Sequence, residues 1–456
     1  MNTQEAEQAY VRSHPKSKAL YEKAKTLFPD GVTHDSRTFN PFPPYIERTK
    51  GSHKWDVDGH EYICYAMGHG ASILGYSHPA VAEAVREQAG KGSHYSGSHQ
   101  GEIELAELIK QLFPSIEKLR FVNSGTEANM MAVRLARTYT GRPKLVKLGG
   151  NFHGWADALY VGVDAPFDQP TAGLPPGMQD NVIVVPPNDV PALEAALSTG
   201  EVAAVILEGG GAHMGTVPTS AEYARAARDL CTKYGSILIF DEVVTGFRWT
   251  PGGWQEDIGV QPDLSTMAKI LMGAHPGGGV GGKAELLDLI QHRDDPHWNR
   301  YQRMPHPGTF NANPISVAAG IACLKIIATG EPHRRANEVA DKLRRGIHSI
   351  IQEHGVSGAC YGVKSMFHIY LGDCDKDPTE YSSLPPVDQS KLLGHGGSAA
   401  ATGGLRKNML FNGVDCWVRL GICSMAHTDE DIEKTLEAFE KSLNTVTEDG
   451  NAPLRS

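Results

Sequence analysis

The chain has few cysteines, and their arrangement excludes two classes of protein. Its 456 residues include seven cysteines, an odd and scattered set with no C-x-x-C spacing. A disulfide framework typically shows a dense, even set in a short secreted chain, and a structural zinc site shows paired cysteines. We therefore expect reduced thiols, as in a cytoplasmic protein, and neither a disulfide scaffold nor a zinc module.

Long apolar runs and an excess of basic residues are also missing. No apolar stretch approaches the roughly 20 residues that span a bilayer, and residues 1–18 are polar, unlike a signal peptide. The formal net charge is −10, with the two signs mixed along the chain. This balance argues against non-specific nucleic-acid binding. We expect a cytoplasmic protein that engages neither nucleic acid nor membrane.

Metal-binding motifs are absent although histidines are numerous. The 20 histidines form no H-E-x-x-H motif, and His94 and His99 have no acidic partner set beside them in the sequence. We therefore expect no metal site.

What the middle of the chain does contain is an alternation of apolar strand-like runs with helical segments. The candidate strands are residues 119–122, 144–148, 182–185, 203–207 and 236–240. Such alternation predicts an α/β fold with a mostly parallel central sheet covered by helices on both faces. Ligands bind such sheets outside the carboxyl ends of the strands.

The two ends of the chain differ from this middle part. The sequence predicts an opening helix over 5–28, short strands near 45–47 and 54–56, and a hairpin turn at 56–59. After residue 314 it predicts helices over 315–328, 332–354 and 429–443, short strands at 366–371 and 416–420, and a loop at 394–404. We expect an N-terminal segment (1–75), a large domain (76–325) and a smaller α+β domain (326–456), with the N-terminal segment packed on the small domain.

One strand-to-helix junction has the properties of an anion site. The strand 119–122 runs into Ser124, Gly125 and Thr126, where an amphipathic helix begins. A helix N-terminus offers free N–H groups, a glycine allows close approach, and hydroxyls add donors. The junction predicts a phosphate cradle, although a simple N-cap has the same sequence pattern.

Two acids and one lysine follow strand-like runs. Glu208 follows 203–207 and Asp241 follows 236–240, while Lys269 lies among apolar neighbours before a glycine-rich stretch. A buried acid needs a cationic partner, and apolar surroundings lower a lysine pKa. These positions predict a Schiff base between Lys269 and pyridoxal phosphate (PLP), with Asp241 holding the pyridine nitrogen protonated. Taken singly, the acids are also compatible with a helix cap or a solvated loop, and the lysine with an ordinary surface residue.

Five ordered motifs resemble the class III PLP-dependent aminotransferases. They are Asn-Ser-Gly-Thr-Glu-Ala at 123–128, Phe-His-Gly at 152–154, Phe-Asp-Glu-Val-Val-Thr-Gly-Phe-Arg at 240–248, Pro-Asp-Leu-Ser-Thr-Met-Ala-Lys at 262–269 and Gly-Thr-Phe-Asn-Ala-Asn-Pro at 308–314. Within the class, the chain is most similar to the glutamate-1-semialdehyde aminomutase-like branch, over about residues 31–443. The resemblance implies the PLP-dependent transferase fold type I.

The resemblance also implies roles for individual residues. Lys269 and Asp241 match the Schiff-base lysine and the pyridinium partner. The other cofactor-binding positions that it implies are Ser124, Gly125 and Thr126 at the phosphate, Val243 under the ring, Phe152 over it, and Glu208 and His213 beside it. Thr309 matches a threonine that reaches the phosphate of the neighbouring subunit, which implies a homodimer with shared active sites. Arg37 matches an arginine that clamps a substrate carboxylate, and a solvated loop arginine is the alternative.

Departures from the family pattern leave the substrate open. Glu208 is followed by Gly209 where the family usually has proline, and His213 and Phe152 replace an asparagine and a tyrosine. The first expectation is a transaminase that moves an amino group from an amino acid or amine donor to a keto acid or aldehyde acceptor. An intramolecular glutamate-1-semialdehyde 2,1-aminomutase is the alternative, because residues 172–176 resemble its gating loop. An amino acid racemase or epimerase and a non-catalytic relative remain further alternatives, the last opposed by the joint presence of Lys269 and Asp241.

Overall fold

The computed structural model describes residues 2–169, 171–394, 397–417 and 419–455. The chain begins with two helices and a three-stranded meander: α1 (Thr3–Ser13), α2 (Pro15–Ala24), β1 (Ile46–Lys50), β2 (His53–Asp56) and β3 (Glu61–Cys64). The predicted opening helix over 5–28 is wrong in its continuity. Pro15 cannot donate the hydrogen bond that would continue α1, so His14 leaves helical geometry and Pro15 becomes the first residue of α2.

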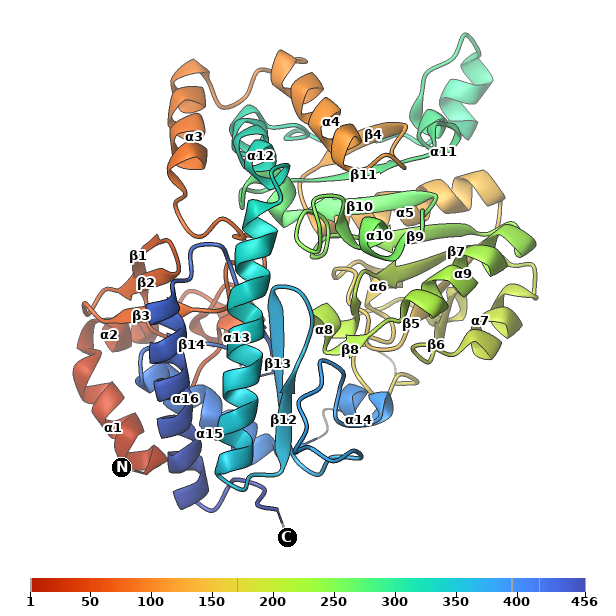
Figure 1. Cartoon of the computed structure of the whole chain (residues 1–456). Helices are drawn as coiled ribbons and strands as arrows, with labels where there is room; N and C mark the ends of the chain where they lie inside the picture. Colours follow the sequence, from red (N-terminus) through yellow and green to blue (C-terminus); the bar gives the residue numbers. More distant parts are fainter. Residues whose placement is uncertain (1, 170, 395–396, 418, 456) are drawn as a thin grey trace.

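The large part of the molecule surrounds a seven-stranded sheet (Figure 1). Its strands are β4 (Lys118–Val122), β5 (Lys144–Leu148), β6 (Val182–Val185), β7 (Val202–Glu208), β9 (Ile237–Asp241), β10 (Leu264–Ala268) and β11 (Gly278–Gly282). They lie in the order β4-β11-β10-β9-β7-β5-β6. The neighbouring strands from β6 to β10 are parallel, whereas β11 pairs antiparallel with β10 and β4. The predicted mostly parallel sheet is confirmed.

Helices cover both faces of this sheet. Alternate residues of β7 point to opposite faces: Ala204 and Ile206 pack with α5, and Val205 and Leu207 pack with α7 and α9. The helices of this part are α3 (Pro79–Lys91), α4 (Gln100–Leu112), α5 (Gly125–Thr140), α6 (Asp157–Tyr160), α7 (Val190–Leu197), α8 (Ala212–Gly215), α9 (Ala221–Tyr234), α10 (Gly253–Ile258), α11 (Ala284–Leu287) and α12 (Pro314–Ile327), with a short strand β8 (Val217–Pro218).

The C-terminal part forms a smaller layer of helices and strands. Its elements are α13 (Glu331–Glu353), β12 (Gly358–Tyr361), β13 (Met366–Leu371), α14 (Gln389–Leu393), α15 (Ala399–Phe411), β14 (Val414–Asp415), β15 (Gly421–Ile422) and α16 (Asp429–Glu448). Strands β12, β13 and β15 form an antiparallel sheet. The α+β character expected for this part is confirmed.

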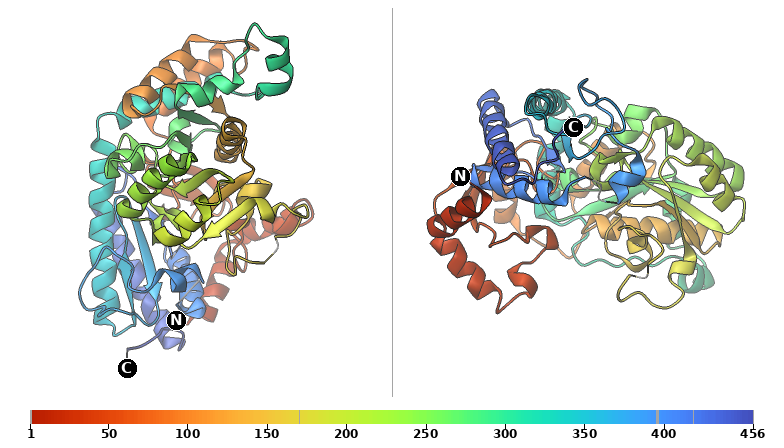
Figure 2. Two further views of the ribbon diagram at one scale, coloured as in Figure 1. Left: turned by 90° about the vertical axis from the view of Figure 1, so that its right-hand side faces the viewer. Right: turned by 90° about the horizontal axis from the view of Figure 1, so that it is seen from below.

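The N-terminal segment is continuous in space with the C-terminal part. β3 pairs with β14, so that Ile63 lies opposite Val414, and α1 lies beside α15 (Figure 1 and Figure 2). Ile63 and Tyr65 belong to the same buried cluster as the inner faces of α13 and α16. This packing agrees with the expected association. The boundaries 1–75, 76–325 and 326–456 stay a prediction.

Two further expectations for the C-terminal part are wrong. The glycine-rich stretch 394–404 is not all loop, because α15 begins at Ala399, where Ser398 Oγ accepts from the Ala401 N–H. Gly404 lies inside this helix beside Val446, and a Cβ on Gly404 would lie 3.2 Å from the valine side chain. Packing therefore decides the conformation of a segment that composition assigns to a loop. Residues 395–396 of that stretch lie outside the described residues.

The strand expected at 416–420 is the connection between β14 and β15. Residue 418 within it also lies outside the described residues. Among the residues that the structure describes, no single helix is long and apolar enough to cross a membrane. One bent pair, α12 with α13, satisfies the length and composition criteria when taken together.

Candidate active site

Strand register brings the two predicted acids and the lysine to one edge of the sheet. Glu208 lies opposite Asp241 across β7 and β9, and Asp241 lies opposite Thr266 across β9 and β10. Lys269 follows β10 directly. The site therefore lies at the carboxyl ends of parallel strands, where α/β sheets bind ligands.

Asp241 is buried and is held by three donors. Its Oδ2 accepts hydrogen bonds from Asn129 Nδ2 at 2.8 Å and from His153 Nδ1 at 2.7 Å, and its Oδ1 accepts from the Val243 N–H at 3.0 Å. A buried carboxylate with this set of donors is both solvated and fixed in orientation. Oδ1 keeps a lone pair for one further donor.

Asn129 and His153 were not among the residues predicted for the site. His153 occupies the middle of the Phe-His-Gly motif, so its signal was present in the sequence, whereas Asn129 looks like an ordinary position of α5. Burial lowers the pKa of His153, opposed by its hydrogen bond to Asp241. A neutral imidazole donating from Nδ1 to the acid is therefore expected at neutral pH.

Lys269 differs from an ordinary lysine in conformation and in charge. Its φ is +54°, in the left-handed region. Burial lowers the pKa of Lys269 to about 8, while the charges of Asp241 and Glu208 act to raise it. Its amine makes no hydrogen bond with any residue that the structure describes. A lysine with this pKa supplies a substantial fraction of free amine near neutral pH.

Glu208 connects two loops at the edge of the site. Its Oε2 accepts from the Phe152 N–H at 3.0 Å, and its Oε1 accepts from the Met214 N–H at 2.9 Å. Burial raises the pKa of Glu208 to about 8, and the two backbone donors oppose this shift. Both carboxylate oxygens are thus used to position the loops that carry Phe152 and His213.

The predicted phosphate cradle is assembled from separate segments. Ser124 caps α5 by accepting from the Glu127 N–H at 3.2 Å. A Cβ on Gly125 would lie 2.8 Å from the side chain of Val243, and a Cβ on Gly154 would lie 2.3 Å from Thr126 Oγ1. The structure therefore brings Ser124–Thr126, Gly154 and Val243 together, and only glycine fits at two of the approaches.

Phe152 and His213 lie in loops at the rim of this edge. Phe152 is 48% exposed and meets Tyr160 edge-on at 6.4 Å. His213 has φ +50° in the turn of α8, and a Cβ on Gly150 would lie 3.7 Å from His213 Nε2. The histidine ring therefore lies beside the loop that leads to Phe152.

Arg37 lines a cavity together with His69, whose pKa responds to the charge of Lys269. The arginine donates from Nη1 to Thr33 Oγ1 at 2.7 Å and shares a cavity of about 510 Å³ with His69, Arg406 and Trp417. Burial lowers the pKa of His69 to about 4, and the charges of His34, Lys269 and Arg37 contribute in the same direction. The charges of both Arg37 and Lys269 therefore act on His69. The sequence analysis did not identify His69 as a residue of the site.

Thr309 lies at a different cavity of the single chain. Its carbonyl accepts from His94 Nε2 at 2.8 Å, and the cavity, of about 700 Å³, is also lined by Tyr95, Arg120 and Phe310. Phe310 is 58% exposed and Tyr95 is 42% exposed. Thr309 therefore does not join Arg37 and His69 within one subunit, and its expected role towards a neighbouring subunit stays a prediction.

Comparison with known proteins agrees with this architecture. The family profile "Aminotransferase class-III" matches residues 35–375. A glutamate-1-semialdehyde 2,1-aminomutase from Methanopyrus kandleri is 36% identical over 451 residues, which is 96% of this chain and 99% of that protein. The enzyme of the same name from Rhodopirellula baltica is 41% identical over 444 residues, covering 95% of this chain and 97% of the relative.

Solved structures show the same fold. An omega-transaminase from Sphaerobacter thermophilus is 32% identical with a TM-score of 0.85 and covers 94% of this chain and 98% of its own. A β-phenylalanine aminotransferase from Variovorax paradoxus is 28% identical with a TM-score of 0.83, covering 100% and 99%. Fold type I is thereby confirmed. The chain belongs to the class III aminotransferases, a family of PLP-dependent enzymes.

Proposed function

We propose that Lys269 binds PLP covalently and that Asp241 pairs with the ring nitrogen of the cofactor at the carboxyl edge of the large sheet. The observation that carries this proposal is the strand register, which aligns Glu208, Asp241 and Thr266 across neighbouring strands, with Lys269 directly after the strand that carries Thr266. The lowered pKa of Lys269 supports it, since a charged amine is not nucleophilic.

The residues present fit the cofactor. The N-terminus of α5, with a close approach at Gly125, suits a phosphate group. Oδ1 of Asp241 has a lone pair for a ring N–H, while Asn129 and His153 hold Oδ2. We assign Ser124, Gly125 and Thr126 to the phosphate and Phe152, Glu208, His213 and Val243 to the surroundings of the ring.

The chain's own side chains divide the work of amino transfer. Bound PLP supplies an electron sink for charge that develops on the substrate carbon. Lys269 Nζ acts as nucleophile and, once released by the substrate amine, as the base that removes and returns the proton beside the amino group. Asp241 keeps the ring nitrogen protonated, and Arg37 orients a substrate carboxylate from the cavity that it lines.

For the reaction itself, we propose the glutamate-1-semialdehyde 2,1-aminomutase activity, which yields 5-aminolevulinate. The relatives at 36–41% identity, which cover nearly the whole chain, carry this name. They favour the alternative of the sequence analysis over its first expectation, an intermolecular transaminase. The reaction moves an amino group within one carboxylate-bearing molecule, and Arg37 is the proposed partner of that carboxylate.

The test supplies the pyridoxamine form of the holoenzyme with glutamate 1-semialdehyde and no keto acid. Many equivalents of 5-aminolevulinate per active site are expected, and none from Lys269→Ala. Consumption of glutamate 1-semialdehyde that stops at one equivalent per active site, and resumes only when an amino donor is added to restore the pyridoxamine form, would overturn the aminomutase assignment while leaving the cofactor assignment intact.

Intermolecular transamination is the second candidate. It is favoured by the solved omega-transaminase and β-phenylalanine aminotransferase structures at 28–32% identity and by the departures at Phe152 and His213. Conversion of a β-amino acid that depends strictly on added pyruvate, with no turnover of glutamate 1-semialdehyde, would establish it.

We further propose a homodimer in which Thr309 reaches the phosphate cradle of the partner. The exposed Phe310 and Tyr95 beside Thr309 support an interface there. Mixed dimers of Lys269→Ala and Thr309→Ala chains test this. A contact between subunits leaves one intact site per hybrid and restores activity, whereas a contact within one subunit restores none.

A further inference from the structure

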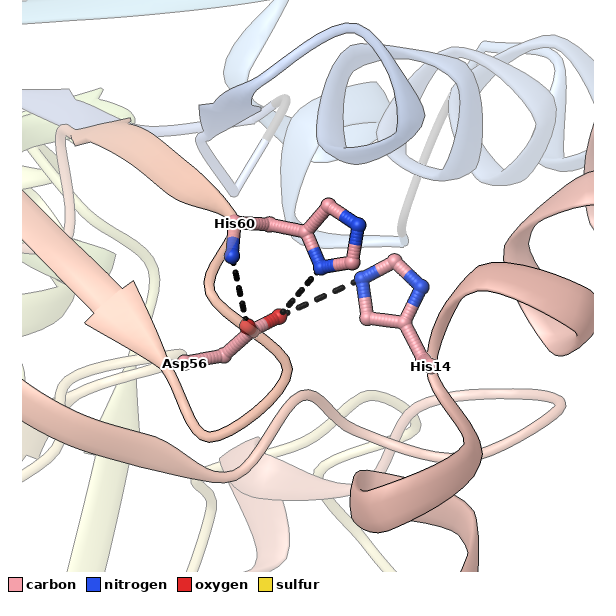
Figure 3. A group of neighbouring side chains, drawn as sticks. All are labelled: His14, Asp56 and His60. Atoms are coloured by element: carbon pink, nitrogen blue, oxygen red, sulfur yellow. Dashed lines mark hydrogen bonds and ion pairs between the residues drawn. The ribbon is translucent and has the colours of Figure 1, made fainter.

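Three side chains of the N-terminal segment converge away from the PLP site. His14 lies at the break between α1 and α2, Asp56 ends β2, and His60 follows the hairpin turn (Figure 3). Asp56 Oδ2 lies 3.2 Å from His14 Nε2 and 3.3 Å from His60 Nδ1. The three ligand-type atoms lie within 4.8 Å of one another.

The proton on His14 can be assigned from its surroundings. His14 Nδ1 lies 2.9 Å from the carbonyl oxygen of Tyr10, and a carbonyl only accepts. Ser13 Oγ donates to the same carbonyl, so it is free to accept from Nδ1 as well. Nδ1 therefore carries the proton, and the lone pair of a neutral His14 points from Nε2 towards Asp56.

Fewer protons are available than are needed by the acceptor atoms around Asp56 Oδ2. The Tyr62 hydroxyl lies 2.8 Å from both His14 Nε2 and Asp56 Oδ2, but it has only one proton to donate. His60 Nδ1 is buried and has no hydrogen-bond partner among the described residues. The imidazoles of His14 and His60 stack at 4.0 Å, which disfavours charge on both rings. A cation would satisfy all three atoms at once.

We propose that His14, Asp56 and His60 bind a divalent transition-metal ion of the zinc type. Two imidazole nitrogens and one carboxylate oxygen are common zinc ligands, and tetrahedral bonds of about 2.0–2.1 Å place neighbouring ligand atoms about 3.3 Å apart. The two measured separations from Asp56 Oδ2 agree with this spacing. Burial also lowers the pKa of His14, which favours the neutral, metal-binding form.

The fourth coordination position faces solvent. His14 and His60 line a cavity of about 690 Å³ that also contacts Asn408 and Glu437, and this cavity gives a water molecule access to the fourth position of the proposed site. The ion joins the α1–α2 break to the β2–β3 hairpin. The role of the ion is therefore structural: it stabilises the packing of the N-terminal helices on the hairpin, and it takes no part in amino transfer.

The second arrangement that satisfies the cluster is a doubly protonated His14 paired with Asp56, without an ion. Equilibrium dialysis of the untagged holoenzyme against zinc chloride separates the two, with metal counted per chain by elemental mass spectrometry. His60→Ala removes one proposed ligand at a half-buried position and leaves the hydrogen bonds of Tyr62 with His14 and Asp56 in place. His292→Ala removes an exposed histidine elsewhere and is the matched control.

The proposal expects wild type and His292→Ala to bind about one zinc per chain more than His60→Ala. It also expects zinc to raise the melting temperature of the first two proteins and not of the third. All three should keep the visible absorbance of bound PLP, which checks that His60→Ala is folded. Equal zinc counts in wild type and His60→Ala, or equal thermal shifts, would overturn the site.

Discussion

Asn129 donates a hydrogen bond of 2.8 Å from its side-chain amide to Asp241 Oδ2. The amide cannot rotate freely, because Thr266 Oγ1 donates to its oxygen at 2.6 Å. Thr266 in turn lies opposite Asp241 on the adjacent strand. Two strands and one helix therefore fix the direction of the acid that faces the proposed cofactor ring.

This relationship predicts that Asn129→Ala weakens cofactor binding. A hydrogen bond to a charged group contributes about 1.5–3 kcal/mol, and its loss frees Oδ2 to turn away from the position that Asn129 and His153 maintain. Loss of visible absorbance during dialysis should be at least tenfold faster than in wild type. Thr266→Val, which disturbs only the orientation of Asn129, should show a smaller effect. Equal effects of the two variants would count against this order of contacts.

Two lysines with lowered pKa values allow a matched test of the Schiff-base assignment. Lys269→Ala should abolish activity and the visible band of the bound cofactor. Lys147 is fully buried, and burial lowers the pKa of Lys147 to about 7, but its amine donates to the Leu159 carbonyl at 2.8 Å. Lys147→Met should therefore keep the band. Persistence of the band in the Lys269 variant, with loss in the Lys147 variant, would reassign the covalent site.

The pKa of Lys269 predicts how cofactor capture depends on pH. Only the neutral amine attacks an aldehyde, so the rate at which apoenzyme gains visible absorbance should rise with pH and level off above about pH 8. The stability of the apoenzyme should also rise with pH between pH 8 and the ordinary lysine pKa of 10.5, because the unfolded chain binds more protons than the folded chain in this range. A midpoint near 10.5 would refute the lowered pKa.

Arg37→Ala should separate substrates by charge. An arginine that pairs with a carboxylate contributes only to acidic substrates, so kcat/KM should fall at least tenfold for amino acids and change little for simple amines. Arg48→Ala is the control, since Arg48 stacks on Trp55 at 3.6 Å outside this cavity. Equal losses for acids and amines in the Arg37 variant would refute the clamp.

Arg248 joins three distant parts of the chain and predicts a stability effect. The fully buried guanidinium donates to the carbonyls of Gly70 and Cys423 and to Ser365 Oγ. Arg248→Met leaves these acceptors unpaired inside the protein, so unfolding by urea should show a loss of at least about 3 kcal/mol. Arg225→Met, at an exposed position of α9, should cost less than about 0.5 kcal/mol. A loss of similar size in both variants would contradict the bridging role.

Much of the proposed site could be predicted because it depends on local rules. Asp241 ends one buried strand and Lys269 follows another, and Ser124 and Gly125 begin a helix soon after a third. Strand ends and helix starts are set by nearby residues, and a parallel sheet brings its carboxyl ends to one edge. The segment 394–404 shows the limit of such rules. Its composition predicts a loop, whereas in the structure α15 begins at Ala399 and packs Gly404 against Val446.

The sequence alone determined the alternation of strands and helices in the middle of the chain, the edge at which the acids and the lysine lie, and the family. The tertiary structure decided which groups surround them. Asn129 reaches Asp241 across 112 residues, and Arg248 reaches Gly70 across 178, and no local pattern specifies such contacts. His69 beside Arg37, and the meeting of His14 with Asp56 and His60, likewise depend on how separate elements pack. Hydrogen bonds and pKa values follow distance in space, and only the folded chain sets those distances.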